Sequence, residues 1–363
     1  MALFIGILGL PNVGKSTLFN ALTQGNAEAN NYPFCTVEPN LGQVEVPDLR
    51  LVRLNEVLSP ISCTPTHIQF VDIAGLVRGA SRGEGLGNQF LAHIREADAL
   101  IHVVRCFEGE QIAHVDGRID PIEDIAVVET ELMLADLDTG NQVLTRLEKV
   151  LRSDPRAPEK AEFEVVSRVI EGLKENVPIR SLGLNLDEKR LIATSHFLTG
   201  KEVLYLANVG EEDLPEGGPW VEKLKAHLGD NRVLAVSAQI ESEMMELSGE
   251  DREIFLEELG LDDMGLNRLV LEGYGLLHLI TFYTVANQKL QAWQLEQGTA
   301  APRAAGKIHS DMEAGFIRAE IVGYEDLMAS RGMEKARSGG QLRTEGKEYV
   351  IEDGDVVQFL FKT

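Results

Sequence analysis

The chain has 363 residues, and at about 150 residues per domain this length predicts two or three domains. Its 34 basic and 58 acidic residues give a formal net charge of −24, which excludes attraction of the whole surface to nucleic-acid backbones or anionic lipids. A content of 44% hydrophobic and 25% charged residues excludes wholesale disorder and is typical of a globular chain.

The cysteines and the apolar N-terminal segment indicate where the protein works. Cys35, Cys63 and Cys106 are odd in number and form no CxxC pair, which favours a reducing compartment and excludes a disulfide or zinc framework. The apolar start lacks a basic leader and runs directly into a glycine-containing motif, so we interpret it as a buried strand. The sequence contains no run of about 20 apolar residues, so it predicts no membrane-spanning helix. We expect a soluble cytoplasmic protein without a membrane partner.

Short apolar runs alternate with helical patterns over the first hundred residues. Strands are expected at 3–8, 68–73 and 99–106, and helices at 15–24 and 86–97. Strands that alternate with helices predict a mostly parallel sheet with helices on both faces, which is an α/β fold.

The rhythm then changes to two long helical patterns. Apolar residues recur at helical spacing over 121–151 and again over 163–173, with Asp154-Pro155 between them. Because the residue before a proline disfavours the α conformation, we expect a break there and an antiparallel helical hairpin. Strand-like runs return at 202–207 and 232–237, so the hairpin is expected to be an insertion within one sheet.

The last part of the chain has a different character. Strand-like runs at 280–285, 316–322 and 349–361 are separated by glycine-rich basic loops, which predicts a β-rich module of about 85 residues. One stretch of it holds five basic and two acidic residues: Arg331, Lys335, Arg337, Arg343 and Lys347 against Glu334 and Glu345. This local excess could meet RNA phosphates, or it could be an ordinary solvated loop.

The segment from Gly9 to Ser16, GLPNVGKS, matches the pattern GxxxxGK[ST] between an expected strand and an expected helix. In that context the glycines let backbone amides converge on a phosphate at the N-terminus of the helix. Lys15 is expected to bridge the β- and γ-phosphates, and the Ser16 hydroxyl to bind Mg²⁺. The predicted phosphate-binding residues are Asn12, Val13, Gly14, Lys15, Ser16 and Thr17, with Lys15 also catalytic.

A second signal, Asp72-Ile73-Ala74-Gly75, ends the expected strand at 68–73. The Asp72 carboxylate is expected to hold a metal-bound water, and the Gly75 amide to meet the γ-phosphate. Such a DxxG sequence alone is equally typical of a surface turn, and its place at a second strand end is what makes it informative. Thr36, in the polar loop between the motifs, is a candidate for the Mg²⁺ shell, although ordinary turn chemistry explains it as well.

The third signal is the loop Asn208-Val209-Gly210-Glu211 after the strand at 202–207. GTPases carry NKxD here, where the Asp accepts hydrogen bonds from guanine. Asn208 could pair the N6/N7 edge of adenine, whereas Glu211 is one methylene longer than Asp and spoils a fit to guanine. Ser237 and Ala238, after the next strand, are expected to supply the backbone side of the base pocket. The alternative is that Asn208 and Glu211 belong to an ordinary loop.

This order of motifs resembles the P-loop G domains of the translation-factor class. The glycine-rich segment 76–87 resembles the second switch of the Obg family. The NVGE loop, the helical insertion and the C-terminal β module together resemble the YchF subfamily, the Obg-like ATPases. The resemblance covers essentially the whole chain. It implies a G domain in two parts (1–116 and 200–277), an inserted helical domain (117–199) and a C-terminal TGS domain of β-grasp type (278–363).

The resemblance also implies an activity and a partner. It implies that ATP is preferred over GTP and that the protein associates with the ribosome or its large subunit, with rRNA a candidate contact and no DNA partner. Ras-like enzymes place a Gln after the DxxG glycine, whereas here Leu76 cannot hydrogen-bond the attacking water, so we expect slow hydrolysis. His93 falls on a helix and His102 in a strand, but His114 lies in a polar loop and matches the loop histidine that the resemblance favours as catalytic.

Two further points remain open on the sequence. Asn12 stands at a P-loop position where an Asn helps bind K⁺ in some G proteins, so K⁺ is a second candidate ion beside Mg²⁺. A slow, Mg²⁺-dependent ATPase switch on the ribosome is the function we expect first. The alternatives are a true GTPase of the Obg type, a nucleotide-sensing binding module with incidental hydrolysis, and a nucleotide-independent ribosome or RNA adaptor.

Overall fold

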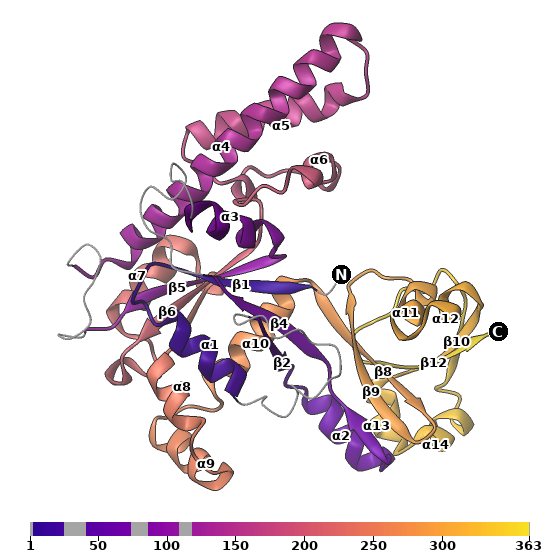
Figure 1. Ribbon diagram of the computed structural model, residues 1–363. Helices are drawn as coiled ribbons and strands as arrows, with labels where there is room; N and C mark the ends of the chain where they lie inside the picture. The colour runs from indigo at the N-terminus through magenta and orange to yellow at the C-terminus, as the bar shows by residue number, and fades with distance from the viewer. Residues whose placement is uncertain (1–2, 25–40, 74–85, 109–117, 363) are drawn as a thin grey trace. The chain divides into compact units, whose positions relative to one another are not determined.

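The computed structural model describes residues 3–24, 41–73, 86–108 and 118–362, and the chain divides into two compact units (Figure 1). The first unit consists of Met1–Gly42 and Gln69–Leu269, and the second of Gln43–Ile68 and Val270–Thr363. No helix in the described ranges is both long and apolar enough to cross a membrane.

The first unit is built on a sheet with the strand order β2-β4-β1-β5-β6-β7. The strands are β1 (Phe4–Leu8), β2 (Leu41–Glu45), β4 (His67–Asp72), β5 (Ala99–Cys106), β6 (Val203–Val209) and β7 (Val233–Val236). The pairs from β4 to β7 are parallel, with Ile7 beside Asp72 and Asn208 beside Val236. Parallel strands end at one edge of the sheet, so the loops after β1, β4, β6 and β7 meet there.

Helices alternate with these strands as the sequence pattern predicts. They are α1 (Lys15–Gln24), α3 (Leu86–Glu96), α7 (Gly218–Leu228), α8 (Ala238–Met244) and α9 (Gly249–Glu258), followed by α10 (Gly265–Leu276), which runs across the boundary between the units. The short 3₁₀ helices η5 (Glu211–Asp213) and η6 (Asp230–Arg232) lie in the connections around α7. Ile5, Ile7, Ile101 and Leu206, from three adjacent strands, are fully buried, as expected for a parallel sheet that is covered on both faces. The predicted α/β fold is therefore confirmed.

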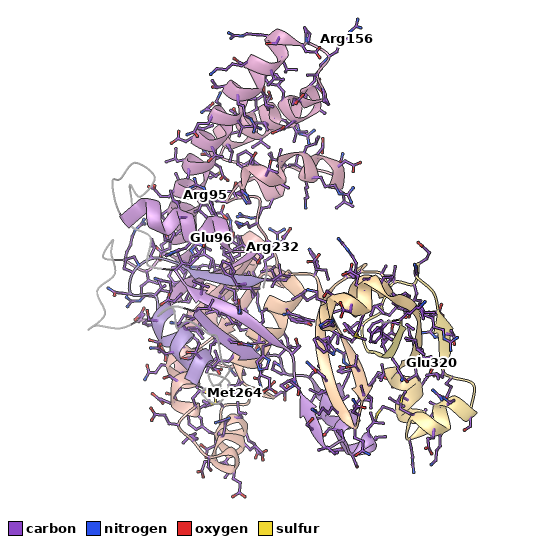
Figure 2. All side chains as sticks on the ribbon, turned by 45° about the vertical axis from the view of Figure 1, so that its right-hand side comes forward. Arg95, Glu96, Arg156, Arg232, Met264 and Glu320 are labelled. Carbon is purple, nitrogen blue, oxygen red and sulfur yellow. The ribbon has the colours of Figure 1, made fainter. Side chains whose placement is uncertain are left out.

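The insertion between β5 and β6 is the predicted helical hairpin, α4 (Pro121–Ser153) and α5 (Glu159–Lys174). Asp120 caps α4 by accepting from the Glu123 amide at 3.2 Å, with proline at the first helical position. Arg156 lies in the turn between the two helices (Figure 2). The chain returns to β6 through η3 (Ile179–Ser181), α6 (Leu186–Ile192) and η4 (Ala193–Ser195). Val166 and Val169 of α5 are fully buried in the core of the hairpin.

The second unit contains a mixed sheet with the strand order β11-β10-β12-β8-β9-β3. The strands are β3 (Ser62–Thr64), β8 (Leu279–Ala286), β9 (Lys289–Glu296), β10 (Phe316–Gly323), β11 (Arg343–Glu345) and β12 (Asp355–Phe361). The helices are α2 (Leu49–Leu58), α11 (Ala301–Ile308), α12 (Ser310–Ala314), α13 (Tyr324–Ser330) and α14 (Met333–Ser338). The run predicted as a strand at 349–361 forms one only from Asp355, because Gly354 has φ +92° and the Glu352 amide turns back to the Asp355 carboxylate.

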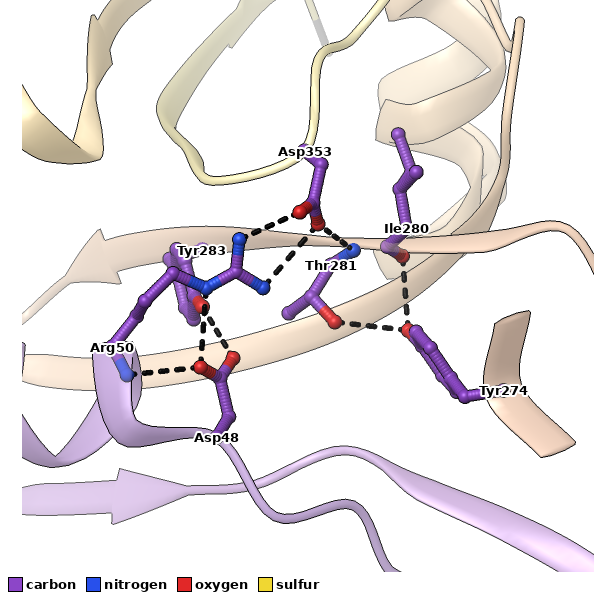
Figure 3. A network of polar contacts seen from close by, with 7 residues as sticks. All are labelled: Asp48, Arg50, Tyr274, Ile280, Thr281, Tyr283 and Asp353. Carbon is purple, nitrogen blue, oxygen red and sulfur yellow. Dashed lines mark hydrogen bonds and ion pairs between the residues drawn. The ribbon is translucent and has the colours of Figure 1, made fainter. Parts of the chain in front are cut away.

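The division into units differs from the predicted domains in its treatment of residues 43–68. Leu51 and Leu54 of α2 pack in one core with Tyr283 and Leu290 of β8 and β9, so this segment belongs to the C-terminal unit. The boundary also falls at Leu269 rather than at 277. A polar network also joins this segment to the C-terminal strands and loops (Figure 3). In it, Asp48, which caps α2, accepts from the Tyr283 hydroxyl, and Arg50 binds Asp353. Local sequence could not show this partnership because its two halves lie far apart along the chain.

Candidate functional site

The loop between β1 and α1 has the backbone that its glycines predict. Gly14 has φ +96°, and a Cβ there would lie 2.2 Å from Nδ2 of Asn208. A Cβ on Gly9 would lie 2.4 Å from the carbonyl oxygen of Val103. Asn12 also adopts a left-handed conformation, with φ +63°. Glycine is therefore required at positions 9 and 14, and the loop curls at the N-terminus of α1, where an anion is stabilised.

Lys15 lies inside this loop and is 7% exposed. Its Nζ donates to the carbonyl oxygens of Gly9 at 3.1 Å and Leu10 at 2.8 Å. Burial lowers the pKa of Lys15 to about 8, and the negative charge of Asp72 opposes this shift. A buried ammonium held by carbonyl groups is best satisfied by an anion, which is the chemistry of a phosphate-binding lysine.

Asp72 and Ser16 form the cation side of the site. The Ser16 hydroxyl donates to Oδ2 of Asp72 at 3.2 Å, whereas the buried Oδ1 has no hydrogen-bond partner among the described residues. Burial raises the pKa of Asp72, against the opposing effects of Ser16 and Lys15. A hydroxyl beside an unsatisfied carboxylate oxygen offers the hard oxygen ligands that Mg²⁺ prefers, so these residues fit the ion that P-loop nucleotide hydrolases ordinarily use.

A cavity of about 580 Å³ adjoins the phosphate loop and is large enough for a nucleoside. Eight of the predicted nucleotide-binding residues line it: Asn12, Gly14, Thr17, Asn208, Val209, Glu211, Ser237 and Ala238. The NVGE loop and the Ser237-Ala238 pair therefore share one cavity with the P-loop, as the motif order predicts. Thr36, Gly75 and His114, which were also predicted, lie outside the residues that the structure describes.

The Asn208 side chain is hydrogen-bonded to the protein at both of its polar ends. It is 4% exposed, its Nδ2 donates to the Val13 carbonyl at 2.9 Å, and its Oδ1 accepts from the Ala238 amide at 2.9 Å. Both polar ends of the side chain thus hold backbone groups of the two neighbouring loops. In this arrangement Asn208 braces the wall of the cavity.

Sequence reasoning missed several cavity residues, of which Phe107 is the most informative. Phe107 follows the end of β5 and lines the cavity, and the Arg105 guanidinium lies over its ring at 4.6 Å while Nε of Arg105 donates to the Phe107 carbonyl at 3.1 Å. The position of Phe107 directly after a parallel strand could have predicted its place in the cavity, because ligands of such sheets bind at the edge where the strands end. Glu108, Glu212, Gln239 and Glu243 also line the cavity.

The candidate catalytic histidines within the described ranges, His93 and His102, lie away from the cavity. His93 is exposed on α3, and His102 is buried in β5 with its ring 5.6 Å from that of Tyr205. Burial, with the positive charges of Arg180 and Lys15, lowers the pKa of His102 to about 3. His102 is therefore a neutral core residue, as its place in an expected strand suggested.

The five basic side chains between Arg331 and Lys347 are all exposed, but two of them have acidic neighbours. Arg337 binds Glu320 at 2.8 Å, and Arg343 lies 4.0 Å from Asp355 and over the ring of Tyr349. Arg331, Lys335 and Lys347 complete the set predicted as a phosphate-binding face. The ion pairs reduce the local positive charge that the sequence count implies.

Comparison with known proteins agrees with this geometry. Residues 4–135 match a family model described as a 50S ribosome-binding GTPase, and residues 279–362 match the YchF-GTPase_C model, described as a protein of unknown function (DUF933). The ribosome-binding ATPase YchF of Bacillus subtilis is 50% identical over 99% of this chain and 100% of its own length. The chain belongs to the YchF family. The protein of the same name from Escherichia coli O157:H7 is 48% identical over 98% of both chains.

Solved structures extend the comparison to the fold. The YchF GTPase of Schizosaccharomyces pombe is 35% identical, with a TM-score of 0.89, and the match covers 99% of this chain and 97% of that one. A GTP-binding protein from Pyrococcus horikoshii, at 20% identity and a TM-score of 0.60, shows likeness of fold alone. The family resemblance and the fold expected from the sequence are confirmed, as is a P-loop nucleotide-binding site. The names of these relatives divide between ATPase and GTPase, so they do not identify the base.

Proposed function

We propose that this protein is a slow, Mg²⁺-dependent hydrolase of ATP, with GTP a weaker substrate, that binds the ribosome in the cytoplasm as a nucleotide-controlled switch. The observation that carries the proposal is the cavity beside the phosphate loop, where Glu211 stands in place of the Asp that reads guanine. The names of the Bacillus subtilis and Escherichia coli relatives, both ribosome-binding ATPases, support the partner and the reaction.

At the phosphate end of the site, separate residues would bind the phosphates and the metal ion. Lys15 would exchange its carbonyl partners for the β- and γ-phosphate oxygens, and its charge would oppose the charge that builds up on them during hydrolysis. Ser16 and Asp72 would hold Mg²⁺, with Thr36 a proposed third ligand. The bound ion supplies neutralisation of the phosphate charge and fixes the β- and γ-phosphates for in-line attack. Gly75 is proposed to donate its amide to the γ-phosphate.

Hydrolysis joins a water oxygen to the γ-phosphorus while the bond to the β–γ bridging oxygen breaks, which yields ADP and phosphate. Leu76 cannot orient that water, which supports a slow reaction, and we propose His114 for this role. His114→Ala is expected to abolish turnover and leave the affinity for ATP unchanged. Lost nucleotide binding, or unchanged turnover, would show that His114 does not orient the water.

Competition between ATP and GTP for the Mg²⁺-loaded protein, read with a fluorescent nucleotide analogue, tests the proposed base preference. We expect ATP to bind at least about tenfold more tightly, a difference of about 1.4 kcal/mol. Glu211→Asp, which restores the side chain of a guanine reader, is expected to move the ratio toward GTP. If GTP binds more tightly to the unaltered protein, an Obg-type GTPase is the correct assignment.

Ribosome association is tested by co-sedimentation with ribosomes in Mg²⁺ and either a non-hydrolysable ATP analogue or ADP. A switch requires binding that depends on which nucleotide is present, and a Lys15→Met variant should lose that dependence. Binding that ignores nucleotide and survives Lys15→Met would identify a nucleotide-independent adaptor. Nucleotide-dependent binding that survives His114→Ala would identify a sensing module whose hydrolysis is incidental.

The C-terminal basic side chains are proposed as the contact with rRNA. Replacing Lys335 and Lys347, both exposed, with Gln should weaken ribosome binding and reduce its salt dependence. Unchanged binding would remove this surface from the interface. The second candidate ion, K⁺, is proposed to bind near Asn12, and equal turnover in KCl and NaCl would exclude it.

A further inference from the structure

A short buried segment, Leu198 to Lys201, returns the inserted hairpin to the sheet just before β6. Thr199 is fully buried, and the segment exchanges hydrogen bonds with α4, η3 and α3. We call residues 198–201 the hairpin joint. Residues 198–201 do not line the cavity beside the phosphate loop.

The contact with α4 goes through Asp136, which is 1% exposed. Its Oδ1 accepts from the Leu198 amide at 2.7 Å, and its Oδ2 accepts from the amide and the hydroxyl of Thr199 at 2.8 and 2.6 Å. Burial raises the pKa of Asp136, and these three donors oppose that shift. A buried carboxylate with three donors fixes the joint to α4 firmly, because loss of the Leu198 bond would leave the buried Oδ1 without its donor and loss of either Thr199 bond would weaken the hold on Oδ2.

The contact with η3 fixes the other end of the hairpin. The Arg180 amide donates to the Thr199 carbonyl at 3.0 Å, and the Ile179 amide donates to the Thr199 hydroxyl at 3.3 Å. The Arg180 guanidinium also binds Glu129 of α4 and donates to the hydroxyl of Tyr205 in β6 at 3.1 Å. The start and the return of the hairpin are therefore tied to the same point of the sheet.

The contact with α3 goes through Lys201. Its Nζ donates to the carbonyl oxygen of Arg95 at 3.1 Å and to that of Ala97, at the C-terminal end of α3, where Figure 2 shows Arg95. A cation at this end of a helix satisfies carbonyl groups that have no partner within the helix. Burial lowers the pKa of Lys201, while the carboxylates of Asp98 and Asp136 favour its charged form.

The order of the elements along the chain links this contact to the nucleotide site. α3 begins at Leu86, on the stretch of chain that continues from Asp72 and the DIAG motif, and α4 begins the hairpin. We propose that Lys201 is a positioning residue that couples α3 to α4, so that the nucleotide bound at the P-loop alters the base of the hairpin. The inference rests on the proposed function only in requiring that the protein distinguishes ATP from ADP. Linkage then requires that a partner on the hairpin alters nucleotide affinity by the same factor.

Hydrogen exchange of the full-length protein tests this coupling. Exchange of the amides in α4 is compared between Mg²⁺ with a non-hydrolysable ATP analogue and Mg²⁺ with ADP. We expect the two states to differ by about fivefold or more around Asp136, the lower end of ordinary allosteric coupling. Lys201→Met should remove the difference, and Lys201→Arg, which keeps a cationic donor, should restore it. Should Lys201→Met not fold, Lys201→Gln is judged by the same criterion.

The matched control is Lys189→Met, an exposed lysine of α6, which should keep the difference between the two states. Nucleotide binding separates positioning from a general loss of structure: Lys201→Met should leave the Kd of the fluorescent analogue within about twofold, whereas a variant that has lost its structure would bind the analogue much more weakly. A difference in α4 that persists in Lys201→Met, or that is absent from the unaltered protein, overturns the proposal. A difference without any ATP turnover would overturn the proposed hydrolase and leave the coupling intact.

Discussion

Arg50 and Asp353 bind each other at 2.7 Å although they stand 303 positions apart in the chain. The second guanidinium nitrogen of Arg50 also donates to Asp353, and Asp353 accepts in turn from the Thr281 amide at 2.9 Å. This pair fastens α2, which precedes β4 and its Asp72, to the C-terminal sheet. Deletion of residues 278–363 would therefore remove the packing partners of Leu51 and Leu54, and point substitutions are the cleaner way to test the C-terminal unit.

Asp353→Ala is expected to lower the free energy of unfolding of the second unit by about 1–2 kcal/mol, because the Arg50 bonds and the Thr281 amide all lose their acceptor. Trp293 lies in β9 and donates to Thr284 at 2.9 Å, so its fluorescence in a Trp220→Phe background reports on this unit during urea unfolding. Asp311→Ala, in the same unit, removes an exposed carboxylate that lies 3.5 Å from His309, and should cost less than about 0.5 kcal/mol. Equal effects of the two substitutions would contradict the role given to the Arg50–Asp353 pair.

The affinity for ATP should fall as the pH rises above about 8. Burial lowers the pKa of Lys15 to about 8 in the free protein, and a bound phosphate favours the ammonium, so the pKa is higher in the complex. Between the two pKa values binding takes up a proton, and the affinity then falls by up to about tenfold per pH unit. Titration of ATP from pH 7 to 9.5 measures this. Adenosine, which lacks phosphates, is the control and should show no such slope.

Asp72→Asn should weaken Mg²⁺ binding in the nucleotide complex by about 10- to 100-fold, the usual range for loss of a supporting group at a metal site. The substitution keeps the size of the side chain but removes its charge. Protons compete with Mg²⁺ for the Asp72 carboxylate as the pH is lowered. Because burial raises the pKa of Asp72, this competition should begin at a higher pH than it would at an aspartate with an ordinary pKa. Mg²⁺ titrations at pH 7 and pH 5 check both effects, with exposed Asp187→Asn as the control.

The phosphate site could be predicted because its determinants are local. Positive φ at Gly14, the helix that starts at Lys15 and the strand that ends at Leu8 all lie within a few residues of one another. The same holds for Asp72, which follows a recognisable apolar strand. These features depend on backbone conformation and hydrophobic period, which a single sequence displays directly.

The second unit and the role of Asn208 could not be predicted in this way. The apolar spacing of Leu51 and Leu54 fits a helix, but nothing near them in the sequence identifies Tyr283 as their partner. Similarly, the Asn208 amide meets the Val13 carbonyl across 195 positions, and a sequence does not show which way an amide points. The motif placed Asn208 at the right cavity, and only the fold showed that its hydrogen bonds go to the protein.

This role makes a prediction about base selectivity. Asn208→Ala leaves the Val13 carbonyl and the Ala238 amide without their present partners, at a cost of about 1–3 kcal/mol. Because these groups position both the phosphate loop and the base loop, the affinities for ATP and GTP should fall together, by roughly 10- to 100-fold. The ratio of the two affinities, measured with the same fluorescent analogue, should stay constant.

Glu211→Asp is the matched comparison, because Glu211 lines the same cavity but is exposed. It should change the ratio of ATP to GTP affinity and leave the affinity for inorganic triphosphate as it was. If Asn208→Ala instead lowers the affinity for ATP while GTP binding is unaffected, the side chain reads the base edge directly. In that case the hydrogen bonds to Val13 and Ala238 must give way when the nucleotide binds.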